Sequence, residues 1–201
     1  MKRFLLVLGL TALLVPALKA EELTAADRKQ ALQYLEKTRA GVLAATKGLS
    51  EAQWNFKPGP DRWSVAEVTE HIAATEDFLM QTVQEKVMKG PPRDGSEDVK
   101  AIDQMVLARI PDRTTKAKAP EPLHPTNRFG SPKASLEHFK ESRGKTIAFL
   151  KETNGLRDHA VDSPLGKKLD AYEWLLFIAA HSERHTKQIE EVKADPGFPK
   201  K

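Results

Sequence analysis

Two histidines, His181 and His185, stand four residues apart near the C-terminal end of the chain. Residues at this spacing lie one above the other on the same face of a helix. Their neighbours on that face are apolar, namely Trp174, Leu175, Ile178, Ile189 and Val192. The pair therefore interrupts a stripe that would otherwise pack in a core. Because neutral imidazole is the commonest metal-binding side chain, this pattern predicts a metal site inside a helical protein.

A third histidine, His71, lies in a separate amphipathic segment, one helical turn beyond Val68 and beside Ile72. One imidazole from this helix and the pair from the other can supply three nitrogen ligands. Three protein ligands leave a coordination position open for water or substrate, as in catalytic metal sites. A fourth protein ligand, such as a carboxylate, would instead indicate a structural site. We predict His71, His181 and His185 as metal ligands. Whether the site is catalytic or structural stays open.

The histidine pair differs from the zinc-protease motif, which requires a glutamate directly after the first histidine. Ser182 occupies that position here. Glu183 lies two residues from each histidine, roughly 200° away around a helix, so it faces elsewhere. The sequence therefore names no general base, and both hydrolysis and group transfer on a small molecule stay open.

Two further polar residues lie on inward helix faces. Gln188 follows His185 by three residues, and we predict that it hydrogen-bonds a ligand imidazole or a metal-bound water. The alternative is a surface amide. Arg143 lies between Phe139 and Ile147, four residues from each. We predict that it binds an anionic group of the substrate, the alternatives being a pair with a neighbouring carboxylate or a snorkelling side chain.

Four amphipathic segments are expected to position these residues. Their N-cap signals are Thr24 with Asp27, Ser64 with Glu67, Ser131 followed by Pro132, and Asp170 with Glu173. The predicted helices cover about residues 24–48, 64–90, 131–155 and 170–193. The connector 49–62, with Pro58, Gly59 and Pro60, is expected to be irregular, and no β-hairpin is expected anywhere.

The connection between the second and third helices, residues 91–131, is long, rich in proline and charge, and mostly irregular, with a short helix expected around 99–110. A connection of this length can return the chain to start a parallel neighbour. The sequence therefore predicts an all-α four-helix bundle in the order up-down-down-up, with a long crossover between helices two and three.

Residues 1–20 have the pattern of a secretory signal peptide. Lys2 and Arg3 precede the apolar run 4–15, which is too short to span a bilayer, and 17–20 resembles a cleavage end. The alternative is an uncleaved N-terminal anchor. Cleavage leaves one domain, residues 21–201, in the periplasm or outside the cell, with no stable membrane insertion.

Cleavage also lowers the formal charge from +4 to +1, since three basic and no acidic residues are lost. No basic stripe with interleaved aromatic residues is visible, so nucleic acid is not an expected partner. The absence of cysteine excludes disulfides, thiolate ligands and a cysteine nucleophile.

The segment Trp63-Ser-Val-Ala-Glu-Val-Thr-Glu-His71-Ile72, preceded by Pro58-Gly-Pro-Asp-Arg62, resembles the helix-two signature of the DinB-like (YfiT-like) superfamily of metalloenzymes. The motif His181-x-x-x-His185-x-x-Gln188 is similar to that family's helix-four motif. The resemblance covers about residues 25–193 and implies an up-down-down-up bundle. It also implies a divalent metal, zinc or nickel, held by His71, His181 and His185.

Some members of that family transfer groups to or from low-molecular-weight thiols. Export argues against this activity here, because such thiols are mainly cytosolic. The sequence thus predicts a secreted or periplasmic metal-dependent hydrolase or group transferase acting on a small molecule. The alternative function is a non-enzymatic bundle that binds a metal or a ligand. For assembly, the sequence is compatible with a homodimer.

Overall fold

The computed structural model describes residues 22–200, so the signal segment expected at 1–20 lies outside the described residues. The helices are α1 (Ala25–Thr46), α2 (Glu51–Asn55), α3 (Val65–Thr82), which continues as the π-helical turn η1 (Val83–Val87), α4 (Val99–Arg109), the 3-10 turn η2 (Glu121–Leu123), α5 (Pro132–Glu152) and α6 (Ala171–Lys193). The strands are β1 (Ala160–Asp162) and β2 (Lys168–Asp170).

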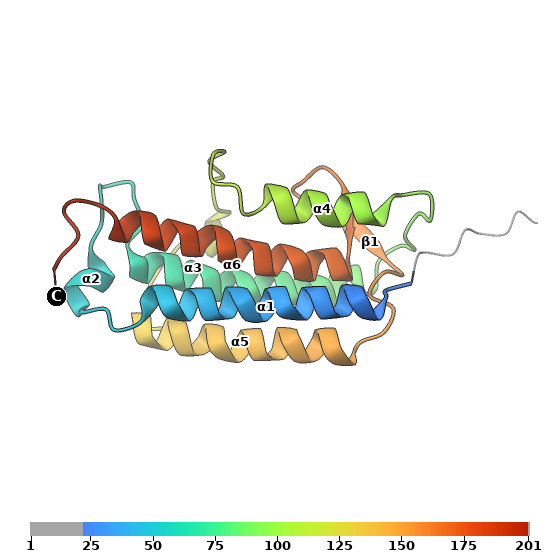
Figure 1. Cartoon of the computed structure of the whole chain (residues 1–201), viewed down its shortest axis with the longest axis horizontal. Helices are drawn as coiled ribbons and strands as arrows, with labels where there is room; N and C mark the ends of the chain where they lie inside the picture. Colours follow the sequence, from blue (N-terminus) through green and yellow to red (C-terminus); the bar gives the residue numbers. More distant parts are fainter. Residues whose placement is uncertain (1–21, 201) are drawn as a thin grey trace, which may run out of the picture.

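Four long helices, α1, α3, α5 and α6, lie side by side as a bundle (Figure 1). Helices α1 and α6 run in one direction and α3 and α5 in the other. At one end of the parallel pair, Tyr172 Oη donates to the carbonyl oxygen of Asp27, and at the other Lys193 Nζ donates to that of Ala45. The predicted all-α bundle with up-down-down-up order is therefore confirmed.

Each long helix begins directly after the residue predicted as its N-cap. Thr24, Ser64 and Asp170 form complete capping boxes, in which the side chain accepts from the N3 amide and the N3 carboxylate accepts from the N-cap amide. Ser131 accepts from the amide of Ala134, with a proline at the first helical position. These local hydrogen bonds fix where each helix starts and thereby its register in the bundle.

The apolar core consists of two clusters stacked along the bundle. One includes Leu35, Val83, Leu150, Leu175 and Ile178, and the other Val42, Val68, Ile72, Phe139 and Ile189. Along each long helix a buried polar residue stands between the two clusters: Thr38 on α1, Glu76 on α3, Arg143 on α5 and Ser182 on α6. The bundle thus carries a polar layer at mid-height.

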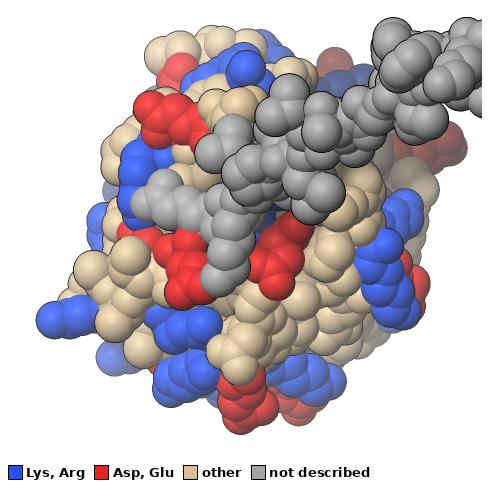
Figure 2. Space-filling view, turned by 90° about the vertical axis from the view of Figure 1, so that its right-hand side faces the viewer, with Lys and Arg blue, Asp and Glu red and all other residues tan. Residues whose placement is uncertain are grey.

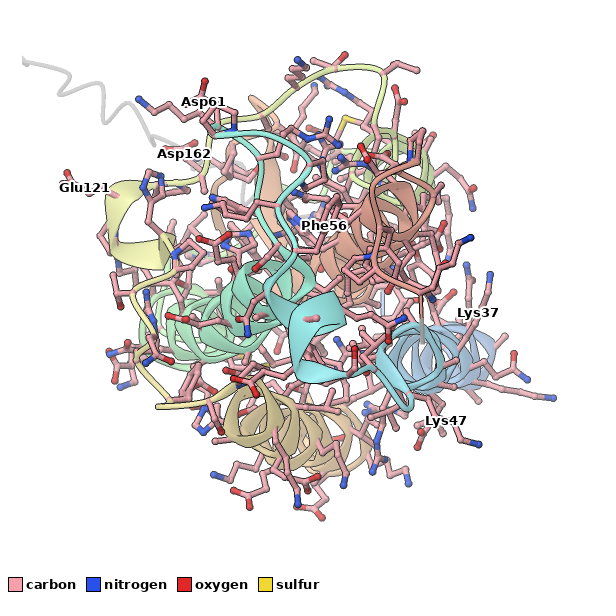
Figure 3. The ribbon with its side chains drawn as sticks, turned by 90° about the vertical axis from the view of Figure 1, so that its left-hand side faces the viewer. Lys37, Lys47, Phe56, Asp61, Glu121 and Asp162 are labelled. Atoms are coloured by element: carbon pink, nitrogen blue, oxygen red, sulfur yellow. The ribbon has the colours of Figure 1, made fainter. Side chains whose placement is uncertain are left out.

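The crossover 91–131 contains more regular secondary structure than expected. Besides the predicted short helix, which is α4 and packs along the outside of α6, it contains η2 beside α3 (Figures 1 and 3). Figure 3 looks along the bundle from the end at which α3 and α5 begin, where Phe56 lies over the middle and packs edge-on against Phe198.

Two expectations were wrong. The connector 49–62 contains α2, which begins at a capping box formed by Ser50 and Gln53. Residues after α5 form an antiparallel hairpin, in which Ala160 pairs with Asp170 around a turn that includes Gly166 at φ 71°. Helix α2 has five residues and each strand has three, which is too few for a periodic sequence pattern to reveal them.

None of the helices within residues 22–200 is long and apolar enough to cross a membrane. On the end of the molecule turned to the viewer in Figure 2, acidic and basic side chains are interspersed over the surface that the figure leaves uncovered.

Candidate metal centre

The fold brings His71 of α3 to His181 and His185 of α6. One ring nitrogen from each lies within 4.8 Å of the others, and the Nε2 atoms of His71 and His181 are 3.2 Å apart. Two nitrogens bound to one cation at about 2.1 Å lie at most about 4.2 Å apart. Side-chain shifts of some tenths of an ångström therefore suffice for all three imidazoles to contact one ion.

The three imidazoles are held in the neutral state that metal binding requires. His71 and His185 are 3% and 8% exposed, and His181 is the most exposed of the three. Burial is the main cause that lowers the pKa of His71 to about 4. Burial also lowers the pKa of His181 and of His185 well below the usual range, and the neighbouring imidazoles act in the same direction.

The outer nitrogens of two imidazoles are fixed by oxygen acceptors. The Nδ1 of His71 lies 2.9 Å from the carbonyl oxygen of Leu123, and that of His185 lies 2.8 Å from Oε1 of Gln188. Because such oxygens only accept, both Nδ1 atoms carry the proton and both Nε2 atoms keep a lone pair, that of His71 being directed at Nε2 of His181. Outer hydrogen bonds of this kind accompany metal-ligating histidines in general.

The predicted hydrogen bond from an imidazole to Gln188 is thus present. Arg113 Nη1 donates to the same Gln188 oxygen at 3.3 Å, which identifies that atom as oxygen and not nitrogen. The other donors of Arg113 form a two-pronged ion pair with Glu191, each contact being 2.6 Å long. Whether Gln188 supports a bound metal stays a prediction.

Leu123 and Arg113 were not predicted from the sequence. Both lie in the crossover, where no periodicity indicates which residues point inward. A backbone carbonyl, moreover, has no signature in the sequence at all. A third neighbour, Trp63, was expected only as a core residue, and its ring centre lies 4.9 Å from that of His71.

Arg143 is completely buried in the polar layer and has all five N–H donors engaged by the protein. Nε and Nη2 bind the two carboxylate oxygens of Glu76 at 2.7 Å, and Nη2 also donates to Ser182 Oγ at 2.8 Å. Nη1 donates to Thr38 Oγ1 and to the carbonyl of Leu35, both at 2.8 Å. The pair with a neighbouring carboxylate, which was one alternative for Arg143, is therefore present. Binding of a substrate by Arg143 stays a prediction, and this arrangement does not support it.

No carboxylate joins the three imidazoles within residues 22–200, where they form a group of three potential ligands by themselves. Glu183, which was expected to face elsewhere, accepts from Tyr34 Oη at 3.0 Å and pairs with Lys187. The donor set is therefore three neutral nitrogens, which fits a divalent transition metal with a further coordination position.

Comparison with known proteins places this arrangement in a family. The sequence matches the DinB superfamily over residues 34–189. It is 33% identical over 150 residues to the uncharacterized protein YuaE of Bacillus subtilis (strain 168), a match that covers 73% of this chain and 87% of YuaE.

The fold is similar to that of YfiT from Bacillus subtilis, described as a probable metal-dependent hydrolase with an unusual four-helix bundle topology. The TM-score is 0.54 at 17% identity, over 89% of this chain and 93% of YfiT, which supports the shared fold. Because the family match spans more than half of the residues, one conclusion follows: the chain belongs to the DinB superfamily.

Proposed function

We propose that this protein is a metal-dependent hydrolase or group transferase that acts on a small molecule. The observation that carries the proposal is the convergence of three neutral imidazoles, two of them with the outer nitrogen fixed by a hydrogen bond, and no carboxylate among them. The similarity in fold to a probable metal-dependent hydrolase supports the same reading. The N-terminal charged and apolar residues support action in the periplasm or outside the cell.

A divalent cation at such a site supplies Lewis acidity, which polarises a substrate oxygen and acidifies water. The chain itself supplies the rest. Leu123 and Gln188 orient the ligand rings, and the buried surroundings keep those rings unprotonated. His181, the most exposed ligand, marks the side from which a small molecule approaches. Imidazole ligands suit zinc and nickel, which are the metals that we propose.

The metal site is tested by elemental analysis of protein purified without added metal. We expect about one equivalent of zinc or nickel in the wild type and loss of it in His181→Ala and His185→Ala. His138→Ala serves as the matched control, because His138 pairs with Asp77 on the surface, away from the three ligands. Equal metal content in the ligand variants and the wild type would overturn the proposal.

The metal-loaded protein is then assayed with ester, amide and thiol substrates. Turnover that is lost with a chelator and regained with metal supports the enzyme. The opposite result, a tightly held metal with no turnover in the wild type, would support a non-enzymatic metal-binding bundle instead.

A further inference from the structure

Beside the three histidines, one carboxylate of α3 binds the crossover instead of joining the group of potential ligands. Glu70, directly before His71, is 5% exposed. Its Oε1 accepts from the amides of Thr126 at 2.8 Å and Arg128 at 3.1 Å, and its Oε2 accepts from the amide of Asn127 at 2.8 Å. The side chain of Arg128 adds a fourth contact, from Nε at 3.2 Å. These four residues are called here the Glu70 clasp.

The backbone of the clasp is shaped for a carboxylate. Asn127 has φ 61°, and no other residue except glycine has a positive φ within residues 22–200. A left-handed residue turns successive amides toward one side, which makes a concave anion-binding surface. All four contacts to Glu70 come from N–H donors, which suits a carboxylate, a group that only accepts.

From the clasp, contacts lead back to the metal centre. Nη2 of Arg128 donates to the carbonyl oxygens of Pro122 at 2.9 Å and His124 at 2.7 Å, the residues on either side of Leu123. The side chain of Leu123 is buried, and its own carbonyl accepts from Nδ1 of His71. Two adjacent residues of α3 are therefore connected by a route through the crossover, with Arg128 as its centre.

We propose that Glu70 is a positioning residue of the metal centre, which fixes the ring orientation and tautomer of His71 through Arg128 and Leu123. This inference rests on the proposed metal site. Glu70 itself touches no ligand nitrogen, so its effect is transmitted by where it holds residues 122–128. When the carbonyl of Leu123 moves, the Nδ1 proton of His71 loses its acceptor, and Nε2 no longer presents its lone pair to the other two imidazoles.

The test is Glu70→Gln, which keeps the size of the side chain but removes its charge and sets an amide NH₂ against backbone N–H donors. Glu67→Gln is the matched control, because Glu67 lies one turn earlier on α3, caps the helix and contacts Lys57, not residues 122–128. Zinc affinity is measured by competition with a chromophoric chelator. We expect a loss of about 10-fold to 100-fold for Glu70→Gln and a change below about 3-fold for Glu67→Gln.

A second measurement needs no metal. Nitrogen-15 spectra of the metal-free protein report which imidazole nitrogen carries the proton. In the wild type and in Glu67→Gln, His71 is expected as the Nδ1–H tautomer alone, and in Glu70→Gln as a mixture. Arg128→Lys, which retains the charge but not the fork to Pro122 and His124, is expected to give the same mixture and decides the matter if Glu70→Gln does not fold.

The outcomes separate the two proposals. Wild-type protein that binds neither zinc nor nickel overturns the proposed function, while the tautomer of His71 still decides the role of Glu70. An unchanged tautomer and unchanged affinity in folded Glu70→Gln or Arg128→Lys overturn the inference and leave the metal site standing.

Discussion

Arg143 is among the largest side chains that the bundle buries completely, and it shows how strongly single residues constrain this core. Its guanidinium forms a two-pronged pair with Glu76, and the same layer includes Thr38 and Ser182, one residue from each long helix. An ion pair in such a place contributes little net stability compared with apolar residues of similar volume. Loss of one partner, however, leaves an uncompensated buried charge.

Replacement of one member of this pair is therefore predicted to cost more than replacement of both. Arg143→Met is expected to lower the free energy of unfolding by about 3–5 kcal/mol, because Glu76 is left buried without a cation. The double variant Arg143→Met with Glu76→Met is expected to recover most of that loss. Urea unfolding of the two variants and the wild type measures both values. A single variant within about 1 kcal/mol of the wild type would contradict the prediction.

A second prediction at this scale concerns Gln188. Gln188→Leu removes the acceptor for Nδ1 of His185, so the ring is no longer fixed in one tautomer. We expect zinc affinity to fall about tenfold, as measured by chelator competition. Gln81→Leu, an exposed glutamine on α3 that contacts Glu85, is the control and is expected to bind like the wild type. Equal affinities in the two variants would refute the role of Gln188.

That His71, His181 and His185 lie together was predictable from the sequence, because the spacing of His181 and His185 on an apolar face and the place of His71 beside Ile72 determine where the rings point. The groups that orient these rings were predictable only where they lie on the same helix. Gln188 does, at three residues from His185. Leu123 and Arg113 do not, since their positions depend on how the crossover packs.

Among the elements, the crossover connects distant parts of the bundle. Its beginning supplies Arg93, which binds Asp170 and Glu173 at the start of α6, while Arg157, before the hairpin, binds Asp170 and Asp103 of α4. All five side chains are buried. Two arginines and three carboxylates thus join α4, α6 and both connections at one end of the molecule.

This cluster predicts a specific dependence of stability on pH. Burial, and then the charge of Asp170, raise the pKa of Glu173 from 4.5 to about 7. Between these values the folded protein keeps a proton that the unfolded chain has released. The contribution of Glu173 to stability is therefore complete below about pH 4.5 and is lost as the pH rises through about 7.

Glu173→Gln, which mimics the protonated side chain, is expected to be less sensitive to pH over this window. Between pH 5 and pH 8, the free energy of unfolding of the wild type should fall by about 1–3 kcal/mol more than that of the variant. Urea unfolding of metal-free protein at both pH values measures it. A difference that stays constant with pH would contradict the raised pKa.

The long helices were predicted closely because each carries a capping signal and an apolar stripe that repeats over many turns. The short elements were missed for the opposite reason. Helix α2 spans little more than one turn, and each strand of the hairpin has three residues. In the second strand, Leu169 is a completely buried apolar residue. What decides such segments is tertiary contact, such as the packing of Phe56 on Phe198.

For the whole molecule, a metal on the three imidazoles would link α3 to α6, two helices that run in opposite directions. Since the unfolded chain has no such preformed site, bound metal stabilises the fold by mass action. At a free metal concentration about 100 times the dissociation constant, the gain is about 2.7 kcal/mol, which corresponds to a rise in Tm of about 5–10 °C for a chain of this size.

Scanning calorimetry with zinc and with a chelator measures this shift. His185→Ala is expected to show little or none, because it lacks one ligand. A wild-type Tm that does not change, or an equal rise in His185→Ala, would indicate that the metal binds elsewhere or not to the folded protein.

The parallel pairing of the first and last long helices has a consequence for how the chain is made. The contact between Tyr172 and Asp27 joins residues 145 positions apart, so α1 gains its parallel neighbour, α6, only when nearly the whole chain has been synthesised. Contacts of such long range make folding slow relative to bundles of sequential hairpins. Two of the three histidines that converge, His181 and His185, also lie on this last helix. The part of the core that α6 contributes and the convergence of the three imidazoles are therefore completed together, at the end of synthesis.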